Sequence, residues 1–159
     1  MYLMKTPLPA KATKLSHSVE INASKEQVWE VVKQIEDIAN FHPLVKESYR
    51  INEIPGQGAK RVCKLLPMGE MVEEIVEWQD GHGFAAEVIG GKMLPPHTLM
   101  MGNLKLEGRG TRTLATFTFS YLLKYGFLGR IMNILLIKPQ FKGAPVKYVE
   151  GLKAYVESA

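Results

Sequence analysis

The chain has 159 residues, of which 46% are hydrophobic and 23% are charged, a composition typical of a folded globular domain. Its net charge of +4 is too small to indicate a nucleic-acid partner. Its single cysteine, Cys63, excludes an intramolecular disulfide and favours a cytoplasmic location. We expect one domain over residues 1–159, with residues 1–14 as a loosely ordered N-terminal extension that lacks the apolar core of a signal peptide.

A strand and a capped helix are predicted at the start of the domain. Val19 and Ile21 alternate with polar residues, which indicates a strand. Ser24 provides an N-cap, and Gln27 three residues later completes a capping box. The apolar residues that follow repeat with helical spacing, and they are Val28, Val31, Val32, Ile35 and Ile38. The helix must end before Pro43, because the residue preceding a proline is disfavoured in the α region.

The middle of the chain is predicted to be a series of strands. Glycine, proline or aspartate occupies each gap between them, as turns require. We expect strands at residues 45–54, 60–66, 70–79, 84–89, 98–107 and 111–122. The short connections indicate antiparallel neighbours, because a parallel pair needs a long crossover. With the first strand, the sequence predicts about seven strands in one twisted sheet.

Helical periodicity returns between about residue 127 and residue 157. One apolar stripe of this segment consists of Val149, Leu152 and Val156, with Tyr148 and Tyr155 beside it. Pro139 and Pro145 should kink or split the helix. Residues 127–137 are apolar on most sides but fall short of the roughly 20 residues that cross a bilayer. Because a helix that is apolar all round is normally buried, we expect it to meet the sheet and to line or close a cavity.

Five short motifs carry a resemblance to a known family. They are V-x-I-x-A-S-x-E-x-V-W at 19–29, D-I-A-x-F-H-P at 37–43, G-x-x-R at 58–61, E-x-I-x-E-W at 73–78 and Y-G-x-L-G at 125–129. With the predicted order of elements, the chain resembles the polyketide cyclase/dehydrase and lipid-transport branch of the START-like, or SRPBCC, superfamily. The resemblance implies an α+β helix-grip fold, in which a curved antiparallel sheet wraps around a long C-terminal helix and short helices follow the first strand. It also implies an apolar cavity between sheet and helix.

The hairpin formed by residues 60–66 and 70–79 has two faces, and both mix charged with apolar residues. Alternation alone leaves open which face is inside. The resemblance implies an inner face of Arg61, Cys63, Leu65, Met71, Glu73, Ile75 and Glu77, with Val62, Lys64, Leu66, Val72, Glu74, Val76 and Trp78 outside. Arg61 and Glu73 would then pair at the cavity wall, either as a structural ion pair or as groups that meet a ligand.

Candidate ligand contacts come from several elements. Phe117, Phe119 and Tyr121 share one face of the last predicted strand, where they either pack in the core or form a cavity wall. Methionines suit a wall that adapts to its ligand. The predicted ligand-binding residues are Phe41, His42, Arg61, Cys63, Glu73, Ile75, Met101, Phe117, Phe119, Tyr121, Phe127, Ile131 and Leu135.

The sequence offers few residues with a clear chemical role. The four histidines have no partner at a metal-ligand spacing, so we expect no metal, and no nucleotide-binding or other cofactor motif is present. If the chain is an enzyme, Glu73, Arg61 and His42 are the candidates for proton handling, and His42 would have a usable pKa without much tuning.

Two classes of function follow. The preferred hypothesis is binding or transport of a hydrophobic small molecule such as a lipid, polyketide, isoprenoid or quinone. The alternative is an enzyme of the polyketide cyclase or dehydratase type that folds its substrate in the cavity. The oligomeric state stays open.

A weaker hypothesis concerns the charge of the C-terminal segment. Against one acidic residue, Glu150, it carries Lys124, Arg130, Lys138, Lys142, Lys147 and Lys153. This excess could place the cavity mouth on an anionic membrane, or it could be a solubilising face on a core helix.

Overall fold

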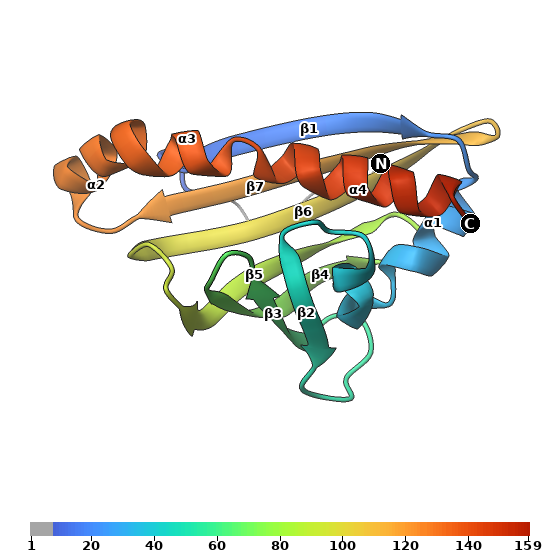
Figure 1. The fold of residues 1–159 in the computed structure, drawn as a ribbon, viewed down its shortest axis with the longest axis horizontal. Coiled ribbons are helices and arrows are strands. Elements are labelled where there is room, and N and C mark those ends of the chain that lie inside the picture. The colour runs from blue at the N-terminus through green and yellow to red at the C-terminus, as the bar shows by residue number, and fades with distance from the viewer. Residues whose placement is uncertain (1–7) are drawn as a thin grey trace.

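In a computed structural model, residues 8–159 are described, and they form a curved sheet of seven antiparallel strands with helices along its concave side (Figure 1). The strand order is β1-β7-β6-β5-β4-β3-β2. The strands are β1 (Thr13–Ile21), β2 (Val45–Arg50), β3 (Lys60–Leu65), β4 (Glu70–Gln79), β5 (Gly83–Lys92), β6 (His97–Arg109) and β7 (Arg112–Leu123). The α+β helix-grip fold predicted from the sequence is therefore confirmed.

The sheet begins earlier in the chain than predicted. Thr13 and Lys14 already pair with Tyr121 and Ser120 of β7, so they belong to β1 and not to a loose extension. The rest of the predicted extension is only partly covered, because residues 1–7 lie outside the described residues.

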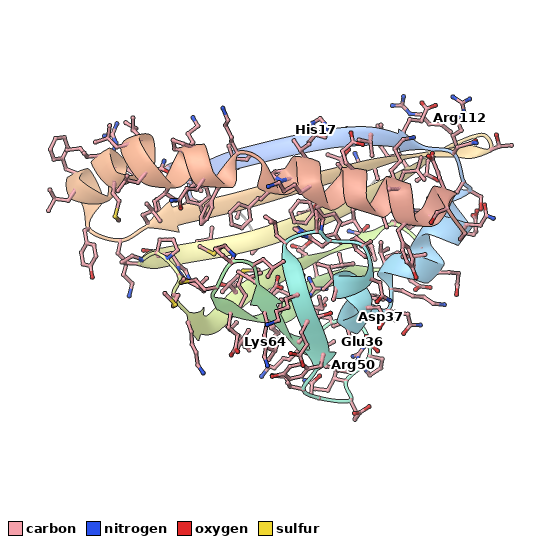
Figure 2. All side chains as sticks on the ribbon, viewed as in Figure 1. His17, Glu36, Asp37, Arg50, Lys64 and Arg112 are labelled. Carbon is pink, nitrogen blue, oxygen red and sulfur yellow. The ribbon has the colours of Figure 1, made fainter. Side chains whose placement is uncertain are left out.

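The segment after β1 forms two short helices where one was predicted. α1 (Lys25–Val32) begins with the predicted capping box at Ser24. A 3₁₀-helix, η1 (Ile35–Asn40), follows it. Ser48 of β2 accepts a hydrogen bond from the Ala39 N–H at 3.1 Å and donates one to the Glu36 carbonyl at 2.6 Å. These bonds to β2, with an ion pair between Glu36 and Arg50 at 3.0 Å (Figure 2), hold η1 against the sheet as a separate turn.

A bulge in β4 changes which side chains face the core. Ile75 and Glu77 lie opposite adjacent residues of β5, so one extra residue stands between them. Trp78 then pairs with Phe84, and its ring centroid lies 5.0 Å from that of Trp29 on α1. The prediction of an outward Trp78 is wrong because it assumed unbroken alternation, and Glu77 instead falls on the face opposite Trp78.

The C-terminal segment is a chain of helices. They are α2 (Gly126–Met132), a π-helical turn η2 (Asn133–Ile137), α3 (Lys138–Phe141) and α4 (Ala144–Glu157). The predicted split falls between α3 and α4, next to Gly143. Helical structure continues through Pro139, which lacks an N–H, directly after the wide π turn.

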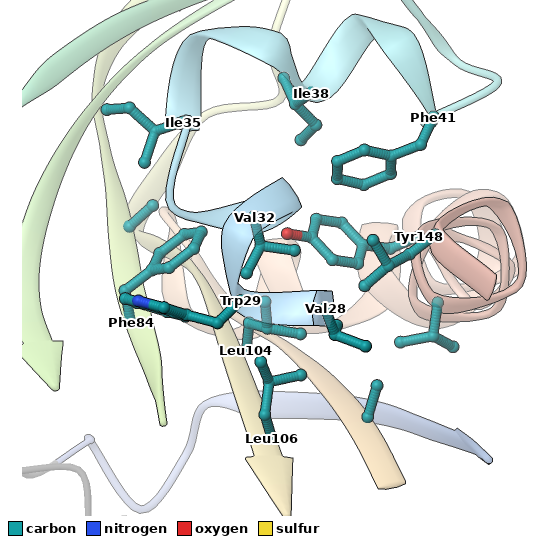
Figure 3. Packing of buried hydrophobic residues seen from close by; sticks show 14 of the residues in the cluster. Val28, Trp29, Val32, Ile35, Ile38, Phe41, Phe84, Leu104, Leu106 and Tyr148 are labelled. Carbon is teal, nitrogen blue, oxygen red and sulfur yellow. The ribbon is translucent and has the colours of Figure 1, made fainter. Parts of the chain in front are cut away.

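α4 closes one half of the concave face. Val149 and Leu152 are completely buried, as the predicted stripe requires. The Tyr148 ring meets the Phe41 ring edge-on, with centroids 5.4 Å apart (Figure 3). A Cβ at Gly151 would lie 2.2 Å from the Phe41 carbonyl oxygen, so only glycine allows α4 to approach η1 this closely.

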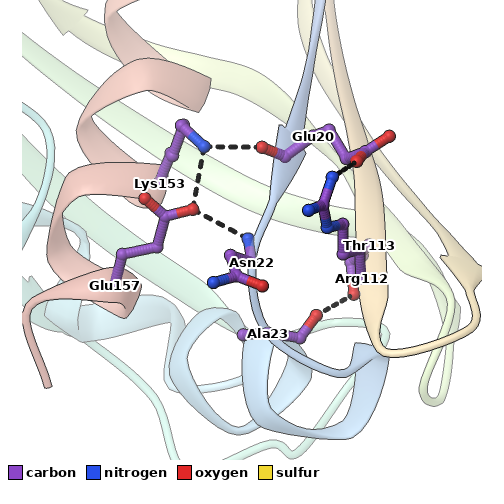
Figure 4. A network of polar contacts seen from close by, with 7 residues as sticks. All are labelled: Glu20, Asn22, Ala23, Arg112, Thr113, Lys153 and Glu157. Carbon is purple, nitrogen blue, oxygen red and sulfur yellow. Dashed lines mark hydrogen bonds and ion pairs between the residues drawn. The ribbon is translucent and has the colours of Figure 1, made fainter.

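A polar network anchors the C-terminal end of α4 (Figure 4). Lys153 Nζ donates to the Glu20 carbonyl at 2.7 Å and to a Glu157 carboxylate oxygen at 2.8 Å. The Asn22 N–H donates to the same Glu157 oxygen at 2.7 Å. Arg112 of β7 pairs with the Glu20 carboxylate at 2.7 Å. α4, β1 and β7 are thereby joined at the end of the molecule that carries α1.

Candidate functional site

A buried polar cluster lies on the concave face of β3 and β4. Arg61 Nε contacts Glu73 Oε1 at 3.3 Å, and Arg61 Nη1 donates to the Ile35 carbonyl at 2.6 Å. The Cys63 thiol donates to the same Glu73 oxygen at 3.4 Å. Burial opposes the charge of Arg61, but the Glu73 carboxylate outweighs it and raises the pKa of the guanidinium. The face predicted to be inside is the one that carries this pair.

Cys63 and His42 are both uncharged at neutral pH in this environment. Burial raises the pKa of the Cys63 thiol to about 12, so it is not a nucleophile. Burial, assisted by the positive charge of Arg61, lowers the pKa of His42 to about 4. His42 Nδ1 accepts a hydrogen bond from the Leu44 N–H at 3.1 Å. The expectation of a usable His42 pKa is therefore wrong, because the ring is packed against Tyr148 and not exposed at a rim.

The aromatic row of β7 faces inward as predicted. Phe117 stacks on Tyr148 of α4 with ring centroids 4.1 Å apart. Phe119 and Tyr121 each lie 5.3 Å from the ring of Phe141 on α3. The row thus runs beneath the C-terminal helices from α4 to α3, and its α4 end is filled by side-chain packing.

Met101 lies on the other face of the sheet from this row. It is opposite Ser120 of β7, whereas Met100 is opposite Tyr121 and belongs to the cluster that includes Phe119. Met101 was predicted to contact the ligand, and the register places Met100 on the concave face instead. Alternation backwards from the buried Leu104 gives the same assignment.

A pocket of about 500 Å³ lies between β1, β7 and α2. We call it the α2 pocket, and its walls are formed by Lys11, Thr13, Tyr121, Leu122, Leu123, Gly126, Phe127, Gly129, Arg130, Asn133 and Ile134. The Tyr121 hydroxyl donates to Asn133 Oδ1 at 2.5 Å, and Asn133 Nδ2 donates to Thr13 Oγ1 at 3.1 Å. Desolvation raises the pKa of Tyr121, so its hydroxyl stays protonated.

The sequence predictions found only part of this pocket. Tyr121 and Phe127 were predicted ligand contacts, while Thr13 and Asn133 were missed. Asn133 could have been predicted as a pocket residue, because a lone amide side chain inside an apolar helical run needs a hydrogen-bonding partner. Thr13 fell in the segment expected to be loose.

The helix around the π turn is far less buried than predicted. Phe127 and Leu135 are 72% and 68% exposed, and Ile131 is 40% exposed. Phe127 lines the α2 pocket, whereas Ile131 and Leu135 do not. The expectation that an all-round apolar helix would be buried is therefore wrong for this segment.

Two further properties follow from the described residues. Within residues 8–159, no three histidine, cysteine, aspartate or glutamate side chains gather closely enough to hold a metal ion. No helix in that part of the chain has the length and apolar character needed to cross a membrane.

The comparison with known families decides the assignment. Residues 12–157 match the family described as polyketide cyclase / dehydrase and lipid transport. The chain belongs to this family. No curated protein matches it.

Several solved structures are similar to this chain in architecture and distant from it in sequence. The Zhui aromatase/cyclase from Streptomyces sp. R1128 has a TM-score of 0.76 at 15% identity, covering 92% of this chain and 94% of that chain. A START superfamily protein from Mycobacterium smegmatis has a TM-score of 0.69 at 15% identity, covering 91% and 97%. A norcoclaurine synthase point mutant from Thalictrum flavum, bound to a transition-state analogue, has a TM-score of 0.70 at 15% identity, covering 96% and 98%. At these identities the likeness shows the fold alone.

Proposed function

We propose that this protein binds a hydrophobic small molecule in the α2 pocket. One observation carries the proposal: about 500 Å³ of space is bounded by apolar side chains with a hydrogen-bonded group, Tyr121, Asn133 and Thr13, at its wall. Sites for small organic ligands have volumes of roughly 300–1,000 Å³, and they combine apolar walls with a few fixed polar groups.

The wall chemistry favours a ligand with an apolar body and a polar or anionic end. Leu123, Phe127 and Ile134 offer hydrocarbon surface, while Lys11 and Arg130 bring positive charge to the same pocket. A lipid, polyketide, isoprenoid or quinone has this character. The family description, which includes lipid transport, supports the same class of ligand.

Binding without catalysis is the better-supported role. Arg61 and Glu73 hydrogen-bond to each other and to neighbouring groups, and neither lines the α2 pocket. His42, with its pKa near 4, is unprotonated at neutral pH and cannot act there as a general acid. These groups resemble a structural ion pair with packed neighbours more than a proton-transfer site.

A cyclase or dehydratase is the second candidate. The Zhui protein, which is named an aromatase/cyclase, has the same fold, and Glu73 is a buried carboxylate on the concave face. If the chain is such an enzyme, it will turn over a polyketide-like substrate, and Glu73→Gln will abolish turnover while ligand affinity is kept. Turnover that survives this substitution would remove Glu73 from the chemistry.

Native mass spectrometry tests the binding proposal. We expect the full chain to retain an apolar molecule, or to gain one from a panel of fatty acids, phospholipids and quinones with a rise in melting temperature. Asn133→Leu keeps the side-chain size but removes the hydrogen bonds to Tyr121 and Thr13, so it should weaken binding of the same probe about tenfold.

Asn22→Leu is the matched control, because Asn22 is an exposed asparagine beside the far end of α4. It should leave binding of the probe unchanged. Wild-type protein that binds no member of the panel, or equal affinity in the wild-type and Asn133→Leu chains, would contradict the proposed pocket.

A further inference from the structure

Large apolar side chains are exposed along α2 and the π turn. We call this set the α2 apolar surface, and its members, with their exposed fractions, are Tyr125 (67%), Phe127 (72%), Leu128 (70%), Ile131 (40%), Ile134 (67%), Leu135 (68%) and Leu136 (58%). Single exposed apolar residues are ordinary on a protein surface. A continuous group on one helical segment instead marks a site of interaction.

The exposure follows from how α2 rests on the sheet. α2 contacts β7 through its Gly129 side, where an added Cβ would lie 2.1 Å from the Lys124 carbonyl oxygen. Ile137 and the partly buried Asn133 continue this inner side into the π turn. The side chains on the remaining circumference of the helix consequently point away from the sheet. In Figure 1, α2 lies at the extreme end of the molecule, opposite the end that carries α1.

The charge around the α2 apolar surface is positive. Between Glu107 and Glu150 the sequence contains no aspartate or glutamate. Four basic residues next to or within the α2 apolar surface are exposed, and they are Lys124, Arg130, Lys138 and Lys142. A partner that satisfies this surface must offer both hydrocarbon and negative charge.

We propose that the α2 apolar surface docks on an anionic lipid bilayer. A helix with exposed apolar side chains flanked by lysine and arginine lies in the membrane interface, with its apolar residues among the acyl chains and its cations at the lipid phosphates. A second copy of the chain fits less well, because a symmetric pair would bring the cations of both copies together with no carboxylate between them.

The α2 pocket opens beside the same helix, and this part of the inference rests on the proposed function. Phe127 and Ile134 belong both to the pocket wall and to the α2 apolar surface, and Arg130 lines the pocket as well. A ligand held there would be separated from the bilayer only by α2 side chains. The docked protein could therefore exchange an apolar ligand with the membrane without moving it through water.

Vesicle co-sedimentation of the full chain tests the docking. We expect binding to vesicles of phosphatidylcholine mixed with phosphatidylglycerol, weak binding to pure phosphatidylcholine, and loss of binding as salt screens the charges. The double variant Leu128→Ser with Leu135→Ser should weaken binding about tenfold or more, because two exposed apolar anchors are lost. Lys138→Glu with Lys142→Glu should weaken it at least tenfold, and only on anionic vesicles.

Matched control variants lie at the β2–β3 loop and on β2. Ile51→Ser with Ile54→Ser replaces two apolar side chains that are about half exposed, and Lys46→Glu inverts an exposed charge. Both variants should bind vesicles as the wild-type chain does. Absence of salt-sensitive binding to anionic vesicles would overturn the proposal. So would a wild-type dimer that Leu128→Ser with Leu135→Ser makes monomeric and that does not bind vesicles, since the surface would then join two copies. Asn133→Leu separates the two proposals, because it should bind the pocket ligand about tenfold more weakly while vesicle binding stays intact.

Discussion

The two halves of the C-terminal helical segment differ in composition and in surroundings, and the more apolar half is the more exposed one. In α4, Val149 and Leu152 are completely buried against the sheet and η1, whereas Leu128 and Leu135 in the α2–π half are about two-thirds exposed. The difference in burial depends on which surfaces each half can pack against. Gly151 lets α4 come within contact distance of η1, and the network around Glu157 fixes its end. The α2–π half rests on β7 by one narrow side only. An apolar helix is thus buried where a complementary surface faces it, and its composition alone does not secure that.

The two halves of the segment are expected to differ in their roles, one in stabilising the fold and the other in binding. The α4 half fills the concave face with packed side chains and carries the Arg61–Glu73 pair nearby. The α2–π half holds the pocket and the exposed apolar surface. Substitutions in the first half should therefore change the free energy of unfolding, and substitutions in the second half should change binding.

The largest expected effect comes from breaking the buried ion pair. Among the described residues, Glu73→Ala leaves the buried Arg61 guanidinium with the Ile35 carbonyl as its remaining hydrogen-bond acceptor. This change should lower the free energy of unfolding by about 4 kcal/mol. Urea denaturation of the wild-type and variant chains measures this loss of free energy of unfolding. Glu47→Ala, which removes an exposed pair with Lys64 at 3.1 Å, is the control and should have little effect. Equal losses in the two variants would show that burial does not distinguish the pairs.

A smaller effect tests the two helix halves directly. Leu152→Ala opens a cavity under α4 and should destabilise the protein by about 3 kcal/mol. Leu135→Ala removes an exposed side chain and should change the free energy of unfolding by less than about 0.5 kcal/mol. If Leu135→Ala proves as costly as Leu152→Ala, then the α2–π half is buried in solution and the contrast between the halves fails.

The smallest effect is a pH dependence near α4. The pKa of His42 is about 4 in the folded chain and about 6.5 when unfolded, so the unfolded chain binds more protons between these values. Stability therefore falls as the pH drops below about 6.5, by about 2 kcal/mol between pH 7.5 and pH 5. Denaturation at several pH values should show this slope in the wild type. His42→Gln cannot titrate, and an unchanged slope in that variant would assign the pH dependence to another group.

Local signals in the sequence predicted most of the fold. The capping box at Ser24, the turn residues between strands and the stripe of α4 are short-range patterns with direct physical causes, and each appears in the structure as predicted. The inward placement of Arg61 and Glu73 required the family resemblance, because alternation could not choose between the two faces. The prediction for β4 assumed unbroken alternation, but the bulge after Ile75 places Trp78 on the opposite face from the predicted one.

The candidate site was harder to predict because it depends on contacts between distant residues. Thr13, Tyr121 and Asn133 meet only when β1 pairs with β7 and α2 folds back over them. The segment from Phe127 to Leu136 is exposed because no surface within the described part of the chain packs against it. The spacing of apolar residues in the sequence cannot predict whether such a surface exists. The predicted ligand contacts at Cys63 and Ile75 stay predictions.

The direction in which α2 faces depends on the number of residues in the π turn more than on the identity of their side chains. Each residue of a helix rotates the following side chains by about 100°. Removal of one residue between Asn133 and Ile137 would leave the composition almost unchanged and give a more regular helix. It would also rotate α2 by about that angle relative to α3, so that Gly129 and Ile137 would no longer share the inner side of the segment. This stretch should therefore tolerate exchanges of one apolar residue for another and resist insertions and deletions.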